Sequence, residues 1–248
     1  MRLAVVSDIH GNLDALMAII DDLNGQSPDL VVNLGDCLSG PLWPAETADL
    51  LMTLPWVTVR GNHDRWLVSP PAVLGAWEVQ ALPDLSYAHL EWLADLPATS
   101  VVEDIFLCHA TPQDDVTYWM EQPGTDGELH RAALQDITER AFGIQQSLLL
   151  CGHSHVARVV RLLDGRLILN PGSVGAPGFT DDDPPHRMAA GTPFASYAIV
   201  DRTVLGWEPS LHMVAYDPSR AVAKAAADRD WAEALATGWV GQIAKIPL

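Results

Sequence analysis

The chain has 248 residues, 48% of them hydrophobic, and a formal net charge of −18. This composition supports a buried core, but it lacks the basic face that binding to polyanionic nucleic acid requires. No apolar run approaches the ~20 residues that cross a bilayer, and no export signal opens the chain, so we expect a cytoplasmic protein without a membrane partner. The three cysteines form no Cys-x-x-Cys pair and are expected to be reduced thiols: Cys37, Cys108 and Cys151.

The N-terminal third predicts strands that alternate with helices. Apolar residues at helical spacing follow Asn12, and Gly25 is expected to end that helix. The apolar runs on either side make a βαβ unit, which implies parallel strands and a right-handed crossover. We expect strands at 3–6, 30–34 and 56–59, and helices at 12–23 and about 44–53.

The middle of the chain is less regular. Residues 65–97 are interpreted as loop and helix, with one helix opened by Ser86. An apolar run that ends at Cys151 predicts a buried strand. We expect strands at about 99–102, 105–108 and 147–151, and a helix at about 126–141.

The last third changes to hairpins. Asp164-Gly165 is a strong two-residue hairpin signal between strands at 156–163 and 166–169. Residues 178–193 hold three Asp and three Pro without periodicity and are interpreted as a long acidic loop. Two strands and a helix follow at 195–201, about 211–216 and about 218–236. Because neither a repeat nor a linker is visible, we expect a single domain over 1–248 with the loop as an insertion.

Polar residues that bind metals follow five separate strand ends. Ligands collect at the carboxyl ends of strands in open α/β sheets, so these side chains are expected to meet. Each motif alone has an ordinary explanation as a turn or a helix cap. Five in one chain are harder to attribute to chance: Asp8 with His10, Asp36, Asn62 with His63, His109, and His153 with His155.

The donor types indicate a dinuclear metal centre. Seven of the eight side chains are suited as oxygen or imidazole ligands, and the mixture fits manganese, iron or zinc better than an all-oxygen magnesium or calcium cage. A strongly acidic protein that acts on phosphates also needs a local source of positive charge, which bound metal ions provide. We expect two divalent ions per chain, manganese first, with iron, zinc or nickel as alternatives.

Taken together, these motifs resemble the calcineurin-like metallophosphoesterase superfamily. Within it the chain is most similar to small bacterial and archaeal phosphodiesterases and to proteins related to diadenosine tetraphosphatases. The resemblance runs from Asp8 through the turn Asn170-Pro171-Gly172-Ser173 to the strand at 195–201. It implies an α/β fold of two stacked mixed β-sheets flanked by helices, a four-layer αββα sandwich.

The resemblance also implies roles for individual residues. One metal would be held by Asp8, His10, Asp36 and His155, and the second by Asp36, Asn62, His109 and His153, so that Asp36 bridges. Asn62 and His63 would face the substrate, and His63 can either protonate the departing alkoxide as a catalytic general acid or stabilise the phosphoryl oxygens. The neighbouring Asp64 is a candidate to orient His63, although an exposed helix-cap carboxylate explains it at least as well. Arg60 is a candidate phosphate ligand, although a charged residue that closes a strand is usually just solvated.

The sequence departs from the family in two places. Many small relatives have a cysteine where this chain has His63, which favours a site equipped with a general acid. Relatives also have a short, Arg-containing link where this chain has the acidic insertion at 178–193. We expect this insertion to border the cleft and to limit substrate size, although an exposed loop without a function explains it equally well.

Three functions remain as alternatives. The first is a metal-dependent hydrolase of phosphodiesters or phosphomonoesters of small molecules, acting through a metal-bridging hydroxide. The second is a nucleotide pyrophosphatase or diadenosine-tetraphosphatase-like hydrolase. The third is a metal-bound scaffold with little turnover, which would not need His63. The expected partner is a small phosphorylated substrate, and the sequence is compatible with either a monomer or a homo-oligomer.

Overall fold

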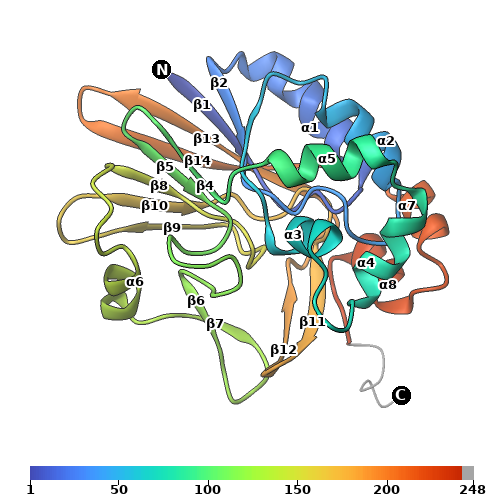
Figure 1. The fold of residues 1–248 in the computed structure, drawn as a ribbon. Coiled ribbons are helices and arrows are strands. Elements are labelled where there is room, and N and C mark those ends of the chain that lie inside the picture. The colour runs from blue at the N-terminus through green and yellow to red at the C-terminus, as the bar shows by residue number, and fades with distance from the viewer. Residues whose placement is uncertain (242–248) are drawn as a thin grey trace.

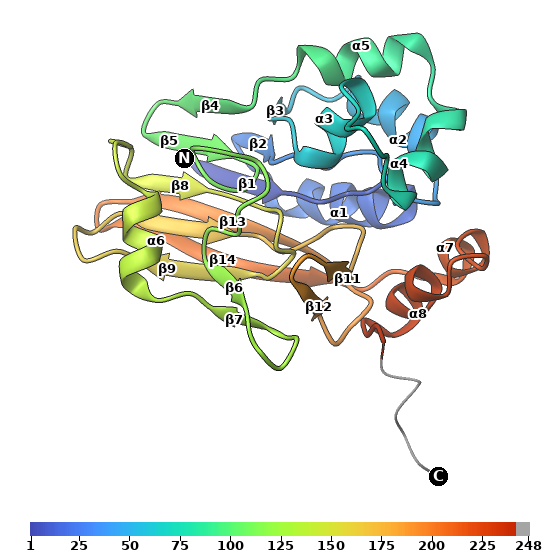
Figure 2. The ribbon, with the colours of Figure 1, turned by 60° about the horizontal axis from the view of Figure 1, so that its bottom comes forward.

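A computed structural model describes residues 1–241 and shows two five-stranded mixed sheets stacked face to face (Figures 1 and 2). The first sheet, in the order β14-β13-β1-β2-β3, consists of β1 (Arg2–Val6), β2 (Leu30–Asn33), β3 (Val57–Thr58), β13 (Ala195–Thr203) and β14 (Gly206–Val214). The second, in the order β4-β5-β8-β10-β9, consists of β4 (Thr99–Val102), β5 (Ile105–Cys108), β8 (Leu148–Leu150), β9 (Arg158–Arg161) and β10 (Leu167–Asn170).

Strand β1 is buried on both faces, and successive side chains alternate between two cores. Leu3 and Val5 pack between the sheets, together with side chains of β5, β8 and β10. Ala4 and Val6 point the other way, into a core that includes apolar residues of several helices. This double burial explains why the strand is a continuous apolar run without polar alternation.

Helices cover the outer faces of both sheets and confirm the expected αββα arrangement (Figure 2). Five of them contribute side chains to the core over the first sheet: α1 (Leu13–Gln26), α2 (Pro44–Leu51), α3 (Asn62–Val68), α4 (Ala76–Ala81) and α5 (Tyr87–Asp95). On the second sheet, α6 (Leu134–Arg140) packs through Ile137. The other helical segments are the 3-10 turn η1 (Leu82–Asp84), α7 (Ser219–Lys224) and α8 (Arg229–Thr237). No helix within residues 1–241 is long and apolar enough to span a membrane.

The strands that carry the predicted ligands run parallel. In the first sheet β1 pairs in parallel with β2, and β2 with β3; in the second, β5 pairs in parallel with β8. Backbone hydrogen bonds continue past these strand ends, from Asp8 N to the Gly35 carbonyl (2.9 Å) and from Gly152 N to the His109 carbonyl (2.7 Å). These hydrogen bonds therefore hold the carboxyl ends of the parallel strands together at one end of each sheet.

The expectation of a long loop at 178–193 was wrong. Residues Gly178–Asp182 and Pro185–Ala189 form an antiparallel hairpin, β11–β12, in which Phe179 pairs with Met188. Met188 and His186 are buried, and this burial stabilises a hairpin whose sequence has no strand periodicity. The acidic insertion therefore has a defined shape.

Three expected helices were also wrong in extent. In place of one helix over 126–141, a small hairpin of β6 (Glu121–Pro123) and β7 (Leu129–Arg131) precedes α6. Gly127 adopts a φ of +78° in its turn, a conformation that a helix cannot include. The expected helix at 218–236 is divided into α7 and α8, and the Asp228 side chain caps α8. The helix at 12–23 continues through Gly25 to Gln26.

The helix predicted after Ser86 is confirmed. Helix α5 begins at Tyr87, and the Ser86 hydroxyl accepts a hydrogen bond from the backbone N–H of His89 (3.3 Å). Within the region interpreted only as loop and helix, α3 and α4 are additional elements. Helix α3 starts at Asn62 itself, so the Gly61–Asp64 motif both forms a helix N-terminus and carries three candidate site residues.

Candidate metal centre

The structure brings the seven predicted ligands together, although they come from strand ends spread over the chain. Six of them form two groups whose donor atoms lie within 4.8 Å of one another: Asp8, His10 and His155 in one group, and Asp36, His109 and His153 in the other. The seventh, Asn62, contacts the second group. All seven are buried except His153, which is half-buried.

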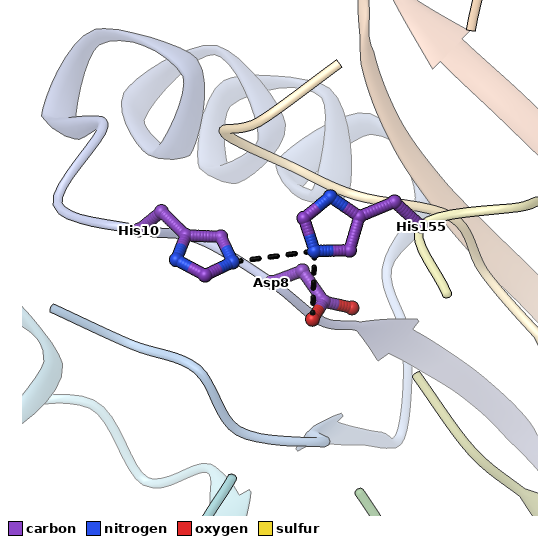
Figure 3. Close-up of side chains that lie close together, drawn as sticks. All are labelled: Asp8, His10 and His155. Atoms are coloured by element: carbon purple, nitrogen blue, oxygen red, sulfur yellow. Dashed lines mark hydrogen bonds and ion pairs between the residues drawn. The ribbon is translucent and has the colours of Figure 1, made fainter. Parts of the chain in front are cut away.

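In the first group the potential ligand atoms converge on one point (Figure 3). Nε2 of His155 lies 3.3 Å from Nε2 of His10 and 3.3 Å from Oδ1 of Asp8. These spacings are those expected between neighbouring ligands of a single transition-metal ion with metal–ligand distances of about 2 Å.

In the second group, Nε2 of His109 lies 3.1 Å from Oδ2 of Asp36. The amide oxygen of Asn62 is 2.9 Å from the same His109 nitrogen. It also lies 3.1 Å from Nδ1 of His153 and 3.3 Å from Oδ2 of Asp36. Four donor atoms therefore surround a second point.

Asp36 lies between the two groups. Its Oδ2 is 3.9 Å from Nε2 of His10 in the first group, and Oδ1 of Asp8 is 4.0 Å from Nε2 of His109 in the second. The two points are thus adjacent, as in dinuclear phosphatase sites, where the metals are about 3.5–4 Å apart.

Each imidazole is oriented by a hydrogen bond from the nitrogen that faces away from the centre. His109 Nδ1 donates to the Leu34 carbonyl (2.7 Å), and His155 Nδ1 donates to the Ala176 carbonyl (2.8 Å). On His153 it is Nε2 that donates, to the Val116 carbonyl (2.8 Å), and His10 Nδ1 bonds to the Ser39 hydroxyl (2.9 Å). Such outer bonds fix the tautomer that leaves the inner nitrogen as a lone-pair ligand.

Two buried oxygen atoms show that these residues fit cations. Asp8 Oδ1 is buried and has no hydrogen-bond partner, although Nε2 of His155 lies 3.3 Å away. The Asn62 oxygen faces only acceptors, and an amide turned by 180° would be the better arrangement without a cation. A metal ion at each point would satisfy both oxygens, so the donor set fits two bound cations.

The protonation states also suit metal binding. Burial alone would raise the pKa of Asp8, but His155 and His109 lower it to about 2. Burial lowers the pKa of His10 to about 3 and that of His153 to about 4. His109 is the exception, because Asp36 and Asp8 overcome the effect of burial and raise its pKa to about 10. Carboxylates and neutral imidazoles are the forms that bind metals.

Five of the seven candidate ligands adopt the left-handed backbone conformation, with φ between 49° and 65°. They are Asp8, His10, Asp36, His153 and His155. This conformation is unfavourable for residues other than glycine, and it concentrates at functional sites where the surrounding structure enforces it.

Two glycines are required by close approach at the centre. A Cβ atom on Gly61 would lie 2.1 Å from Oδ1 of Asp36, and one on Gly152 would lie 1.9 Å from Oγ of Ser7. Real Cβ contacts are never so short. The glycines that precede Asn62 and His153 therefore allow these segments to pack directly against the loops that carry Asp36 and Asp8.

His63 contacts the centre without joining either group. Its backbone N–H donates to Oδ1 of Asp36 (2.9 Å), and its ring stacks on Trp77 at a centroid separation of 5.0 Å. Nδ1 of His63 bonds to the carboxylate of Glu78, which is only 1% exposed. Sequence reasoning missed Glu78, because α4 carries no motif and lies 15 positions further along the chain.

The interpretation of Asp64 as the group that orients His63 is contradicted, because Glu78 does so. Instead, the Asp64 carboxylate accepts hydrogen bonds from the backbone N–H groups of Asp36 (2.8 Å), Cys37 (2.8 Å) and Gly61 (3.1 Å). Burial and the charge of Asp36 raise the pKa of Asp64 to about 6. Asp64 therefore holds the loop that carries Asp36 and does not line the cleft above the centre.

Arg60 is not placed as a phosphate ligand. Its guanidinium donates to the Ala94 carbonyl at the end of α5 (3.3 Å), and it does not line the cleft above the centre. The ordinary interpretation of a charged residue closing a strand is the one the structure supports.

A cleft of about 560 Å³ opens over the centre. Its floor includes Asp36, Asn62, His63, His153 and His155, and its walls include residues of α3, α4 and the hairpin β11–β12. The expectation that residues 178–193 border the cleft is thus confirmed. Several hundred cubic ångströms accommodate a small-molecule ligand.

The fold and this centre define a metallophosphoesterase, a hydrolase that acts on phosphoric esters. The sequence model of the calcineurin-like phosphoesterase superfamily domain matches residues 1–192. The chain belongs to this family, as its motifs led us to expect.

Individual relatives extend over most of the chain. An uncharacterised protein of Methanocaldococcus jannaschii, MJ0912, is 26% identical over 204 residues, which cover 71% of this chain and 76% of that protein. The fold is shared with a metallophosphoesterase from Sphaerobacter thermophilus (24% identity, TM-score 0.72, covering 96% and 99% of the two chains). It is also shared with protein PH1004 from Pyrococcus horikoshii (19% identity, TM-score 0.74, 97% and 99%).

Proposed function

We propose that the chain hydrolyses phosphodiester or phosphomonoester bonds of small molecules at a centre of two divalent metal ions. The observation that carries the proposal is the convergence of seven lone-pair donors on two adjacent points beneath a cleft of about 560 Å³. Manganese is the preferred ion, with iron, zinc or nickel as alternatives, because the donors mix imidazole with carboxylate and amide oxygens.

The seven candidate ligands divide between the two proposed ions according to the two groups described above. Asp8, His10 and His155 would hold one ion, His109, His153 and Asn62 the other, and Asp36 both. When bound, two such cations supply a hydroxide nucleophile at neutral pH and neutralise charge on the phosphoryl oxygens. The chain holds its own ligands rigidly, since each imidazole is fixed from outside by a hydrogen bond.

His63 provides the proton that a poor leaving group requires. With Nδ1 bonded to Glu78, Nε2 is the nitrogen available in the cleft to donate to the departing oxygen. Trp77 and Trp66 pack against the ring at centroid separations of 5.0 Å and 4.9 Å and limit its rotation. A protein that only stored metal would not need an oriented imidazole beside the centre, which favours an enzyme over a scaffold.

The substrate is proposed to be a small phosphorylated molecule, and the location to be cytoplasmic. The three buried cysteines are free thiols, which is compatible with a reducing compartment. The confined cleft supports a small ligand.

The test is turnover of bis(4-nitrophenyl) phosphate and 4-nitrophenyl phosphate by protein loaded separately with manganese, iron, zinc and nickel. We expect hydrolysis of at least one ester, lost on chelation and restored by the metal. The control is the Asp36→Asn variant, which should remain folded and inactive. Absence of turnover with every metal, in protein shown by elemental analysis to be loaded, would contradict the proposal and support a scaffold.

A further inference from the structure

The cleft has aromatic walls. Trp66 and Trp77 line it from α3 and α4, and Tyr118 and Phe179 line it from the loop after β5 and from β11. Tyr118 stacks on His153 at 4.8 Å, and Phe179 meets His155 edge-on at 4.9 Å. Aromatic rings therefore lie directly beside candidate ligands of both ions. The organic part of a bound ester would lie against these rings.

The same cleft is poor in positive charge. Within residues 1–241, no lysine or arginine lines it. The hairpin β11–β12 instead contributes two exposed carboxylates, Asp181 and Asp183. A second phosphate on the substrate would find no lysine or arginine of the described residues in the cleft, and would meet these two negative charges.

The hairpin contacts the aromatic residues at the floor of the cleft. Nε2 of His186, on β12, lies 2.9 Å from the Tyr118 hydroxyl, and Tyr118 stacks on His153. The Asp181 carboxylate of the same hairpin is held in place, because its Oδ1 accepts the backbone N–H of Asp183 (3.0 Å). Its charge therefore has a fixed position at the wall of the cleft.

We propose that this cleft takes phosphate esters whose organic group is planar and uncharged, and that Asp181 and Asp183 reject esters with any further anionic group. The inference rests on the proposed function and narrows its substrate class. It disfavours nucleotide polyphosphates and dinucleoside polyphosphates, which the sequence alone left as an alternative.

The test compares two diesters with the same leaving group, phenyl 4-nitrophenyl phosphate and 4-carboxyphenyl 4-nitrophenyl phosphate. They differ by one negative charge on the retained ring, and neither adds a second phosphate that would chelate the metals. The variants are Asp181→Asn and the double variant Asp181→Asn/Asp183→Asn. Asparagine retains the side-chain oxygen that accepts from the Asp183 backbone.

The matched control is Asp182→Asn. It makes the same change of charge on the same strand, but Asp182 does not line the cleft. Wild-type enzyme should prefer the uncharged diester by kcat/KM. In the double variant, the ratio of kcat/KM for the uncharged diester to that for the charged diester should fall by about fivefold at low ionic strength. At high salt this ratio should fall less, because salt screens exposed charges that lie several ångströms apart. Asp182→Asn should leave it unchanged.

A second measurement does not depend on turnover. Dissociation constants of phenylphosphonate and 4-carboxyphenylphosphonate for the metal-loaded protein should show the same preference and the same narrowing. If the phosphonates discriminate while no ester is hydrolysed, the proposed function fails and the charge selection stands. Equal binding of both phosphonates by the wild type, or equal effects of Asp182→Asn and Asp181→Asn, would overturn the inference.

Discussion

Glu78 fixes one ring nitrogen of His63 from a position that solvent hardly reaches, since its side chain is 1% exposed and that of His63 is 20% exposed. The two residues lie on adjacent short helices, and Trp77 stacks on the imidazole beside them. The pair therefore presents a single nitrogen, Nε2, to a ligand in the cleft. The proton delivery that we propose for His63 is therefore separate from the metal ligands and can be tested on its own.

Replacing His63 by alanine should leave both metals bound and reduce activity according to the leaving group. Alkyl and nucleoside esters should slow by roughly 10²- to 10⁴-fold, the usual contribution of a positioned general acid. Nitrophenyl esters should slow much less, because nitrophenolate departs without a proton. Steady-state rates on both ester types, with metal content measured in parallel, check this. Equal losses on both would indicate that His63 stabilises the phosphoryl oxygens instead.

The Glu78→Gln variant should reproduce part of that loss. Removing a charged hydrogen-bond partner costs roughly 1.5–3 kcal/mol, so we expect about a 10- to 100-fold decrease for alkyl esters. If Glu78 acts only through His63, the double variant His63→Ala/Glu78→Gln should be no slower than His63→Ala. Glu46→Gln on the exposed side of α2 is the control. Additive losses would show that Glu78 has a separate role.

Asp36→Asn should weaken both metals, because Asp36 contacts both ligand groups, whereas His10→Ala should weaken mainly one. Elemental analysis after dialysis against a weak chelator should give less than one ion per chain for Asp36→Asn and about one for His10→Ala, against two for the wild type. Absence of transition metal from metal-supplemented wild-type protein would contradict the dinuclear centre.

Asp64→Asn should destabilise the fold and loosen metal binding together. Asparagine replaces one acceptor oxygen by a donor, which then faces backbone N–H groups that Asp64 now satisfies. The free energy of unfolding should fall by roughly 1–3 kcal/mol, the cost of leaving a buried donor without a partner. Urea titration measures this, with Asp84→Asn at an exposed position as the control. An unchanged midpoint would show that the loop of Asp36 is held by other contacts.

Asp104 should contribute stability that depends on pH. Its carboxylate accepts hydrogen bonds from the Ser147 hydroxyl and backbone N–H, and these bonds lower its pKa below the ordinary value of 3.8. A group with a lowered folded-state pKa stabilises the protein above the unfolded-state value, and this stabilisation is lost as pH falls through the folded-state value. Asp104→Asn should therefore lower Tm at pH 6, with a difference that shrinks below about pH 4. Thermal unfolding across this range, with Asp21→Asn as the control, provides the test; a constant difference would contradict it.

Most of the ligand-bearing loops could be predicted because they follow apolar runs that are buried on both faces, as in β1, β5 and β8. Val5 and Ala4 illustrate why such runs are visible in a sequence: the two cores on either side of β1 require apolar residues at every position. The rule that ligands meet at the carboxyl ends of parallel strands then brings Asp8 near Asp36 without further information.

The partner of His63 and the shape of the insertion could not be predicted, for different reasons. Glu78 reaches His63 only through the packing of α3 against α4, a tertiary contact that leaves no local pattern. In the hairpin β11–β12 the acidic residues are consecutive, at 181–183, and apolar residues are few, so the alternating strand signal is absent although Met188 and His186 are buried.

The left-handed backbone at five candidate ligands has a consequence for how the protein responds to selection. Each such residue costs of order 1 kcal/mol relative to glycine, which adopts this conformation freely. A library of variants selected for thermal stability alone should therefore accumulate glycine or asparagine at positions such as Asp8 and His155. The selected variants would unfold at a higher temperature than the wild type but would no longer bind the metals. Only a screen that also demands turnover would keep the parental residues in place.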